Sequence, residues 1–151
     1  MKKSLSAAHA MTITLLAAAV LLGGMGCNRS KTPYGPKPDY DRSFNLEDSL
    51  TLSFGETAIS EKENISIRFD SLLEDSRCPI DVICFWEGNA RLSFFFEEPA
   101  GAHRFALNTY SGFTRDTLVS SYHISLIDVL PRPVSGREID QKDYKAIVMI
   151  E

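Results

Sequence analysis

From residue 44 onward, hydrophobic residues alternate with polar ones, and the alternation has a period of two. In residues 50–54, leucine and phenylalanine alternate with threonine and serine, and residues 65–70 and 90–97 repeat the pattern. Successive side chains of a β-strand point to opposite faces of the sheet, so this period predicts strands that each have an apolar face. No stretch of ten or more residues has the 3.6-residue period of an amphipathic helix.

Turn-forming residues separate these runs and limit their length. Glycine and proline interrupt the pattern at residues 99–101, 111–112 and 131–136. About six to eight short strands in one domain predict an all-β fold, either an antiparallel β-sandwich or a small barrel. Prolines cannot donate to a strand ladder, so Pro131 should end the strand that contains Leu130. The residues of that strand expected on one apolar face are Tyr122, Ile124, Leu126 and Leu130.

One run of three phenylalanines breaks the alternation. Phe95 should point to the face opposite Phe94 and Phe96. Either both faces of the sheet are covered at this point, which we favour, or Phe95 belongs to an exposed apolar patch.

The N-terminus has the features of an export signal. Lys2 and Lys3 precede an apolar run at residues 11–22, which is too short for a helix that needs about 20 residues to span a membrane. Gly26 and Cys27 follow, and a cysteine at this place resembles the bacterial lipobox. The resemblance implies cleavage before Cys27 and attachment of acyl chains to it. The alternative is cleavage by ordinary signal peptidase, which would leave Cys27 as a free thiol in a soluble periplasmic protein.

The segment after Cys27 predicts a tether. Residues 28–43 contain three prolines and no apolar periodicity, and prolines at this density favour an extended chain. We therefore expect a lipoprotein signal peptide at 1–26, a lipid anchor and Pro-rich tether at 27–43, and a β-domain at 44–151. Asn28 is not the aspartate that retains enterobacterial lipoproteins in the inner membrane, so by analogy we expect the outer membrane, facing the periplasm.

Two further cysteines form a pair. With Cys27 acylated, Cys78 and Cys84 remain, an even number for a chain exported to an oxidising compartment. A structural disulfide is the expected outcome. Redox or metal function is the alternative, although the C-x-x-C spacing is absent and no third or fourth zinc ligand lies nearby in the sequence.

The residues around this pair resemble those of a known group. Residues 75–90 have the pattern D-S-R-C-P-x-x-V-x-C-x-W-x-G-x-A. The pattern is similar to that of an uncharacterised family of bacterial secreted β-domains and lipoproteins, and residues 126–133 and 143–144 are similar to the later part of the same group. The resemblance implies an exported β-domain and no particular activity.

The cysteine loop has both a structural and a functional interpretation. In the structural one, Arg77 pairs with Asp75 or Asp81, Trp86 packs on the disulfide, and Gly88 supplies a bulge or a positive φ. In the functional one, the loop offers a recognition surface, because loops held by a rigid sheet often carry binding. The residues of that candidate recognition surface are Arg77, Trp86 and Glu87.

Charge and motifs narrow the function classes. Removal of the two lysines with the signal leaves 14 basic and 20 acidic residues, a net charge of −6 that argues against binding nucleic acid. His103 and His123 are isolated on different predicted strands, and no hydrolase elbow, calcium loop or phosphate loop is found in the sequence. We therefore expect no catalytic residue, metal or cofactor.

These observations favour a membrane-anchored, non-enzymatic module that binds an envelope protein or stabilises an envelope assembly. The alternative is a small envelope enzyme, or an inhibitor of one, that acts through the Cys78–Cys84 loop.

Overall fold

The computed structural model describes residues 42–151, which form an almost entirely β domain. The predicted signal peptide, Cys27 and nearly all of the predicted tether lie outside the described residues. The described elements are β1 (Arg42–Ser43), β2 (Ser49–Ser53), β3 (Thr57–Ser60), β4 (Ile65–Asp75), β5 (Ala90–Glu98), β6 (Gly101–Asn108), β7 (Asp116–Val119), β8 (Tyr122–Leu130), the short 3-10 helix η1 (Gln141–Asp143) and β9 (Lys145–Ile150).

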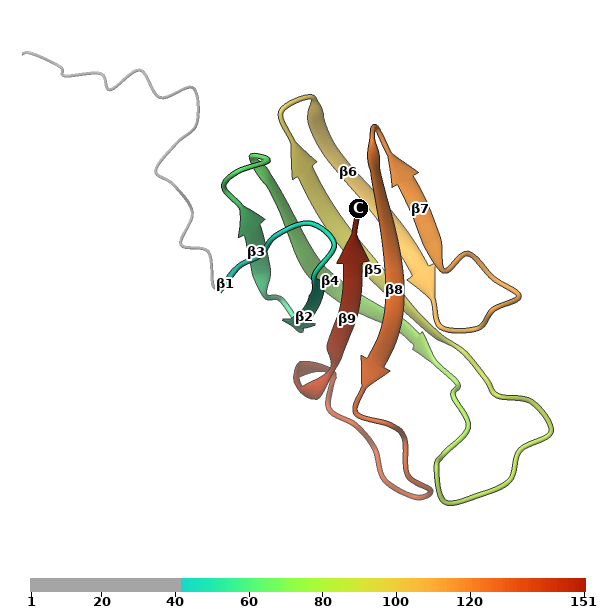
Figure 1. Ribbon diagram of the computed structural model, residues 1–151. Coiled ribbons are helices and arrows are strands. Elements are labelled where there is room, and N and C mark those ends of the chain that lie inside the picture. The colour runs from blue at the N-terminus through green and yellow to red at the C-terminus, as the bar shows by residue number, and fades with distance from the viewer. Residues whose placement is uncertain (1–41) are drawn as a thin grey trace, which may run out of the picture. The chain divides into compact units, whose positions relative to one another are not determined.

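The strands form two sheets that face each other (Figure 1). The five-stranded sheet has the order β1-β3-β4-β5-β6, and the four-stranded sheet has the order β2-β9-β8-β7. Every pair is antiparallel except β1 with β3, which run parallel. The all-β, sandwich-like prediction is confirmed, and the two open sheets decide between the two architectures that the sequence allowed.

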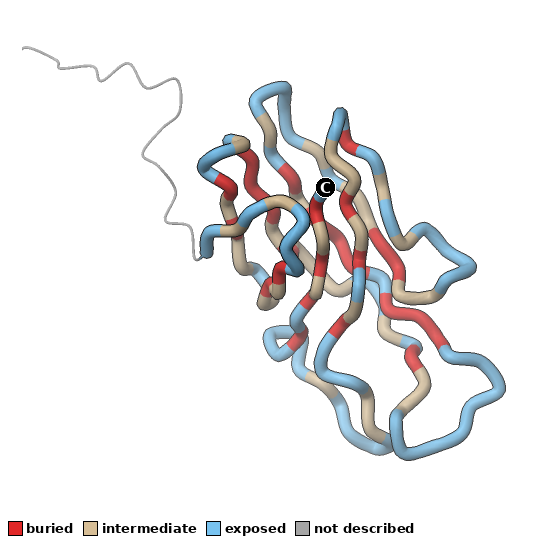
Figure 2. Tube along the Cα trace, viewed as in Figure 1, coloured by how far each residue is buried: buried red, intermediate tan, exposed pale blue. Residues whose placement is uncertain are grey.

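The core lies between the sheets, as the alternation predicts. Leu52 of β2, Ile67 of β4 and Phe94 of β5 are completely buried, whereas their neighbours along each strand are more exposed or face outward. Figure 2 shows buried segments recurring along the facing strands of both sheets. The apolar faces thus leave water together, which is the main favourable contribution to folding.

The outward face of Phe95 is covered by charge. Arg68 and Arg104 place their guanidinium groups 5.2 and 5.7 Å from the centre of the Phe95 ring. Asp70 accepts a hydrogen bond from each arginine, at 2.9 and 2.8 Å, and holds them there. Phe95 is therefore half-buried under two cation–π contacts. Within residues 42–151, side chains of the same sheet, and no additional layer of structure, cover this face, as the favoured interpretation expected.

Leu130 does not lie on the apolar face of β8, and this part of the prediction is wrong. A register shift between Leu126 and Asp128 inserts one residue into the strand. The shift reverses the alternation, so Val129 is completely buried and Leu130 is exposed. β8 does end immediately before Pro131, as expected.

Three strands were not expected from the sequence. β3 and β7 have only four residues each, and β1 has two. The alternation in such short segments is too brief to distinguish from a turn. The parallel pairing of β1 with β3 places residues 42 and 43 in the folded domain, two residues before the boundary expected at residue 44.

Candidate functional site

The candidate site is the loop between β4 and β5, which crosses from Ser76 to Asn89. Backbone hydrogen bonds continue the strand pairing into its base: Ser76 N donates to Asn89 O at 2.7 Å, and Cys78 N donates to Glu87 O at 2.9 Å. The loop is therefore an extension of the sheet at its base and becomes irregular only toward its end.

Gly88 makes this close approach between the two sides of the loop. Its φ is +75°, and a Cβ at this position would lie 2.0 Å from the carbonyl oxygen of Ser76. Both observations require glycine, which has no Cβ and adopts positive φ readily. The positive φ expected at Gly88 is confirmed.

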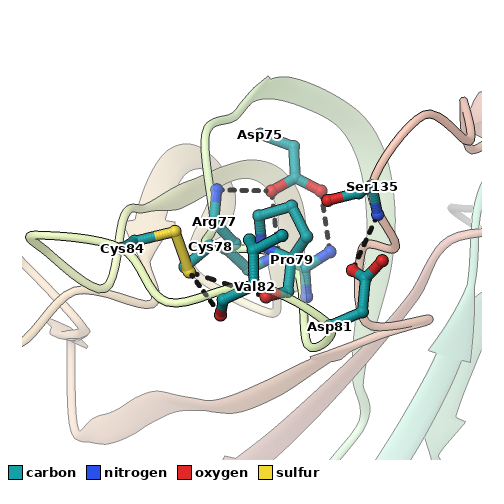
Figure 3. Close-up of a disulfide and its surroundings, with 8 residues drawn as sticks. All are labelled: Asp75, Arg77, Cys78, Pro79, Asp81, Val82, Cys84 and Ser135. Atoms are coloured by element: carbon teal, nitrogen blue, oxygen red, sulfur yellow. Dashed lines mark hydrogen bonds and ion pairs between the residues drawn. A yellow bond between two sulfur atoms is a disulfide. The ribbon is translucent and has the colours of Figure 1, made fainter.

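The disulfide expected between Cys78 and Cys84 is present, with a Cα–Cα distance of 6.0 Å (Figure 3). It closes the outer part of the loop. For a loop of this size, the chain-entropy treatment gives a stabilisation of about 2.4 kcal/mol. In this treatment the bridge stabilises the fold by restricting the unfolded chain.

Asp75 and Arg77 anchor the first side of the loop. The Asp75 carboxylate accepts hydrogen bonds from the backbone N, Nε and Nη2 of Arg77 at 3.1, 2.8 and 2.7 Å. Arg77 also donates to the carbonyl oxygens of Val129 and Pro131. One arginine thus joins the start of the loop to the end of β8 on the opposite sheet.

Tyr144 completes this buried cluster. Its hydroxyl donates to Asp75 Oδ2 at 2.8 Å, and the Arg77 guanidinium lies 6.0 Å from its ring centre. Burial raises the pKa of Asp75, but hydrogen bonds from Arg77 and Tyr144 outweigh it and hold that pKa below its usual range. Burial, together with the hydrogen bond to Asp75, raises the pKa of Tyr144 to about 12. The cluster is a fixed ion pair, and its geometry is that of a brace.

A second brace holds the outer part of the loop. Ile80 N donates to the carbonyl oxygen of Pro133 at 3.0 Å, and Ser135 N donates to Asp81 Oδ1 at 2.8 Å. Both contacts join the disulfide loop to residues 131–136, and Figure 3 shows Asp81 and Ser135 facing each other. The two loops consequently form one supported projection, at the lower end of the domain in Figure 1.

The end of this projection is apolar and exposed. Ile83 and Phe85, on either side of Cys84, have exposed fractions of 103% and 107%. Three more large apolar side chains of the same loop are also exposed, so the exposed set consists of Ile80, Val82, Ile83, Phe85 and Trp86. We call these five residues the loop tip. Scattered apolar residues on a surface are ordinary, whereas a contiguous group marks an interaction site.

The structure separates the three residues of the predicted recognition surface. Arg77 is buried, with 6% of its side chain exposed, and it braces the loop. It pairs with Asp75, the first of its two expected partners. Trp86 and Glu87 are exposed. The ring contact that the structure gives Trp86 is an edge-on one with Tyr110, at 5.7 Å between centroids.

Sequence reasoning missed Ile83 and Phe85. Both occupy variable positions of the cysteine pattern, and apolar residues in a short segment predict burial by default. Two features of the sequence indicate their exposure. Both residues lie between turn-forming residues, and the loop that contains them is too short to form a core of its own.

Each of the two histidines contacts a carboxylate. His103 Nε2 lies 3.0 Å from Glu98, and His123 Nε2 lies 2.8 Å from Asp116. Hydrogen bonds from His123 to Asp116 and then to Glu151 raise its pKa above the usual value. Across residues 42–151, no three His, Cys, Asp or Glu side chains are grouped closely enough to hold a metal ion. No helix in this described part is long and apolar enough to cross a membrane.

In comparisons with known proteins, no family model matches the chain, and no curated protein or solved structure is significantly similar to it.

Proposed function

We propose that this chain is a bacterial envelope lipoprotein that acts as a non-enzymatic binding module, and that the loop tip is its contact with a protein partner. The single observation that carries the proposal is the complete exposure of Ile83 and Phe85 on a loop that is braced on both sides. Exposed apolar side chains on a braced loop are typical anchors of protein interfaces, because the backbone that carries them loses little conformational entropy on binding.

Burial of the two fully exposed side chains would contribute substantially to the free energy of binding. Burial of one isoleucine or phenylalanine side chain contributes about 1.5–3 kcal/mol. Ile83 and Phe85 together would supply about 3–6 kcal/mol, before contributions from the rim. Dissociation constants in the micromolar range need about 8 kcal/mol, so the two anchors account for a large share of such an interface.

A protein is a better match for the loop tip than a lipid bilayer. Asp81 and Glu87 lie within the same loop, and Glu87 is exposed beside Trp86. Entry of a carboxylate into hydrocarbon costs several kcal/mol, whereas a protein surface can pair it with a basic side chain. The partner surface should therefore offer an apolar hollow with basic groups at its rim.

The N-terminal sequence supports the location of the module. Cys27 follows a short apolar run and precedes three prolines in residues 28–43. Acylation of Cys27 would fix the chain to a membrane, and a proline-rich segment of 16 residues would allow up to about 50 Å of reach at ~3.1 Å per residue. On this view the domain samples partners near the outer membrane, on the periplasmic side.

Site-specific photo-cross-linking in living cells tests the proposal. A photoreactive residue replaces Phe85 in one full-length chain and Leu118, an exposed residue of β7 in the four-stranded sheet, in another. We expect a discrete protein adduct from position 85 and none of the same size from position 118. Adducts that are equal at both positions, or absent from position 85, would contradict the proposal.

Inhibition of an envelope enzyme is a second candidate for the same loop. The supporting observation is shape: the disulfide loop and residues 131–136 project together beyond the two sheets, as a convex and braced element (Figure 1). Such a projection fits a concave cleft, which is the usual form of an active site. The identity of the cross-linked protein distinguishes the two candidate functions. If the captured protein is an enzyme whose turnover falls when purified chain is added, inhibition is the better description.

A further inference from the structure

A groove of about 690 Å³ lies on the outward face of the five-stranded sheet, over residues of β4, β5 and β6. Its floor comes from one row of residues across three adjacent strands. Glu74 of β4 pairs with Arg91 of β5, and Arg91 pairs with Asn108 of β6. A carboxylate, a guanidinium group and a carboxamide therefore stand side by side. Ala106, two residue pairs further along and on the same face, has a small side chain that leaves space above the sheet.

The turn after β6 forms the wall of the groove and is fixed in place. Asn108 donates to the carbonyl oxygen of Thr114 from both its backbone N and its Nδ2, at 2.9 and 3.0 Å. Asn89, which is buried, donates from Nδ2 to Asn108 Oδ1 at 3.0 Å. The groove thus has a preorganised edge.

Phe113 supplies an aromatic surface at this wall. Its ring is 52% exposed and lies edge-on to Tyr110, with 5.2 Å between centroids, and Tyr110 is held in turn by Trp86. Gly112 permits this packing, because a Cβ there would lie 2.5 Å from the Tyr110 ring. A half-exposed ring that is held by its neighbours offers a flat apolar face beside polar groups.

Two charged groups of the groove floor can form further hydrogen bonds. The Arg91 side chain has no hydrogen-bond or ion-pair partner within residues 42–151. Glu74 accepts one hydrogen bond, from Ser76 Oγ at 3.1 Å, and a carboxylate accepts several. A strong donor and a strong acceptor of opposite charge are therefore both open to a ligand.

We propose that this groove binds a neutral oligosaccharide. Sugar hydroxyls donate and accept hydrogen bonds, so they match the exposed carboxylate of Glu74 and the exposed guanidinium of Arg91 together. The apolar C–H face of a pyranose ring fits the exposed ring of Phe113. The charges of Glu74 and Arg91 cancel, which favours neither an anion nor a cation, and the groove combines these polar groups with the apolar Ala106 and Phe113.

Titration by two-dimensional NMR tests this site with named probes. The full-length chain, in a detergent without a sugar headgroup, is titrated with chitotetraose, cellotetraose and maltotetraose to about 10 mM, above the millimolar constants expected of a shallow site. We expect saturable shifts of the amides of Arg91, Asn108 and Phe113 with at least one probe, and little change in affinity when salt is raised.

Variants locate the binding. Phe113→Ala and Glu74→Gln change exposed side chains, and each should weaken binding about tenfold. Leu118→Ala, which changes an exposed apolar side chain on the other sheet, should leave binding unchanged. The proposal is overturned if no probe gives saturable shifts, if the shifts fall elsewhere, or if Phe113→Ala and Glu74→Gln bind like the unaltered chain. None of these outcomes bears on the loop tip, which is tested separately.

Discussion

Asp75 accepts three hydrogen bonds from Arg77, two residues later in the chain, and the pair is held against the opposite sheet through Val129, Pro131 and Tyr144. Only 10% of the Asp75 side chain and 6% of the Arg77 side chain are exposed. The pair therefore fixes the base of the disulfide loop from inside the domain. It supports the loop tip but is not part of the exposed surface.

Loss of the Arg77 side chain should destabilise the domain strongly. Arg77→Ala leaves the Asp75 carboxylate buried without its cation, and breaking a buried ion pair in this way costs about 3–5 kcal/mol. Arg132→Ala is the matched control, because Arg132 pairs with Asp128 at the surface at 2.9 Å and should contribute at most about 1 kcal/mol. Urea unfolding of the full chain measures both values. Equal losses in the two variants would show that the Asp75–Arg77 pair is no brace.

Two glycine substitutions separate the cost of positive φ from the cost of a close contact. Gly55 and Gly88 have φ of +77° and +75°, but only Gly88 has an atom within 4 Å of an added Cβ. Gly55→Ala should cost about 1–2 kcal/mol, the usual penalty for an L-residue in this region. Gly88→Ala should cost about 3 kcal/mol or more, because the loop base must open. Thermal unfolding compares them, and similar melting temperatures would contradict the close approach to Ser76.

The Tyr144 hydroxyl predicts a specific loss of stability in alkali. Its pKa rises from 10.0 to about 12 in the folded domain, so the folded state holds this proton more tightly than the unfolded state. The resulting stability is complete below pH 10 and is lost as the pH rises toward 12. Tyr144→Phe should flatten this dependence, as measured by urea unfolding at a series of pH values. An unchanged slope in the variant would exclude Tyr144 as its source.

The same cluster predicts acid sensitivity of the opposite sign. The pKa of Asp75 is lowered in the folded domain, so its contribution is present above the ordinary aspartate value and is lost as the pH falls through the folded value. Tyr144→Phe removes one of the hydrogen bonds that lower it, and should move the acid unfolding midpoint to higher pH. Acid titration followed by circular dichroism measures that midpoint.

Lipid attachment at Cys27 is testable in cells. An alkyne fatty acid supplied in the medium should label the full chain, and Cys27→Ser should abolish the label, because no other attachment site is expected. Cys84→Ser is the control for loss of a cysteine as such, and it should remain labelled. An unlabelled wild-type chain would favour the soluble periplasmic alternative.

The sequence predicted what local pattern controls. The period of two located β4 and β5, cysteine counting predicted the Cys78–Cys84 bridge, and glycine at position 88 indicated the special backbone of the loop base. Each of these features depends on neighbouring residues, and their physical cause can be recognised within a few positions.

The rest depends on contacts between distant segments. Arg77 reaches Val129 across 52 positions, and a single inserted residue in β8 moves Leu130 off the apolar face. Residue type cannot distinguish the exposed Phe85 from the buried Phe94, because both are phenylalanine. The position of the loop tip likewise depends on two braces that join the loop to residues far away in the sequence.

The most direct test of the central claim is the affinity of purified full chain for the protein captured at position 85. Ile83→Ser with Phe85→Ser should weaken binding roughly a hundredfold, corresponding to about 3 kcal/mol of lost apolar burial, with an unchanged melting temperature. Leu118→Ser should leave both quantities unchanged. Equal affinity of the loop-tip variant and the unaltered chain, or a loss of affinity that accompanies a loss of folding, would contradict the account.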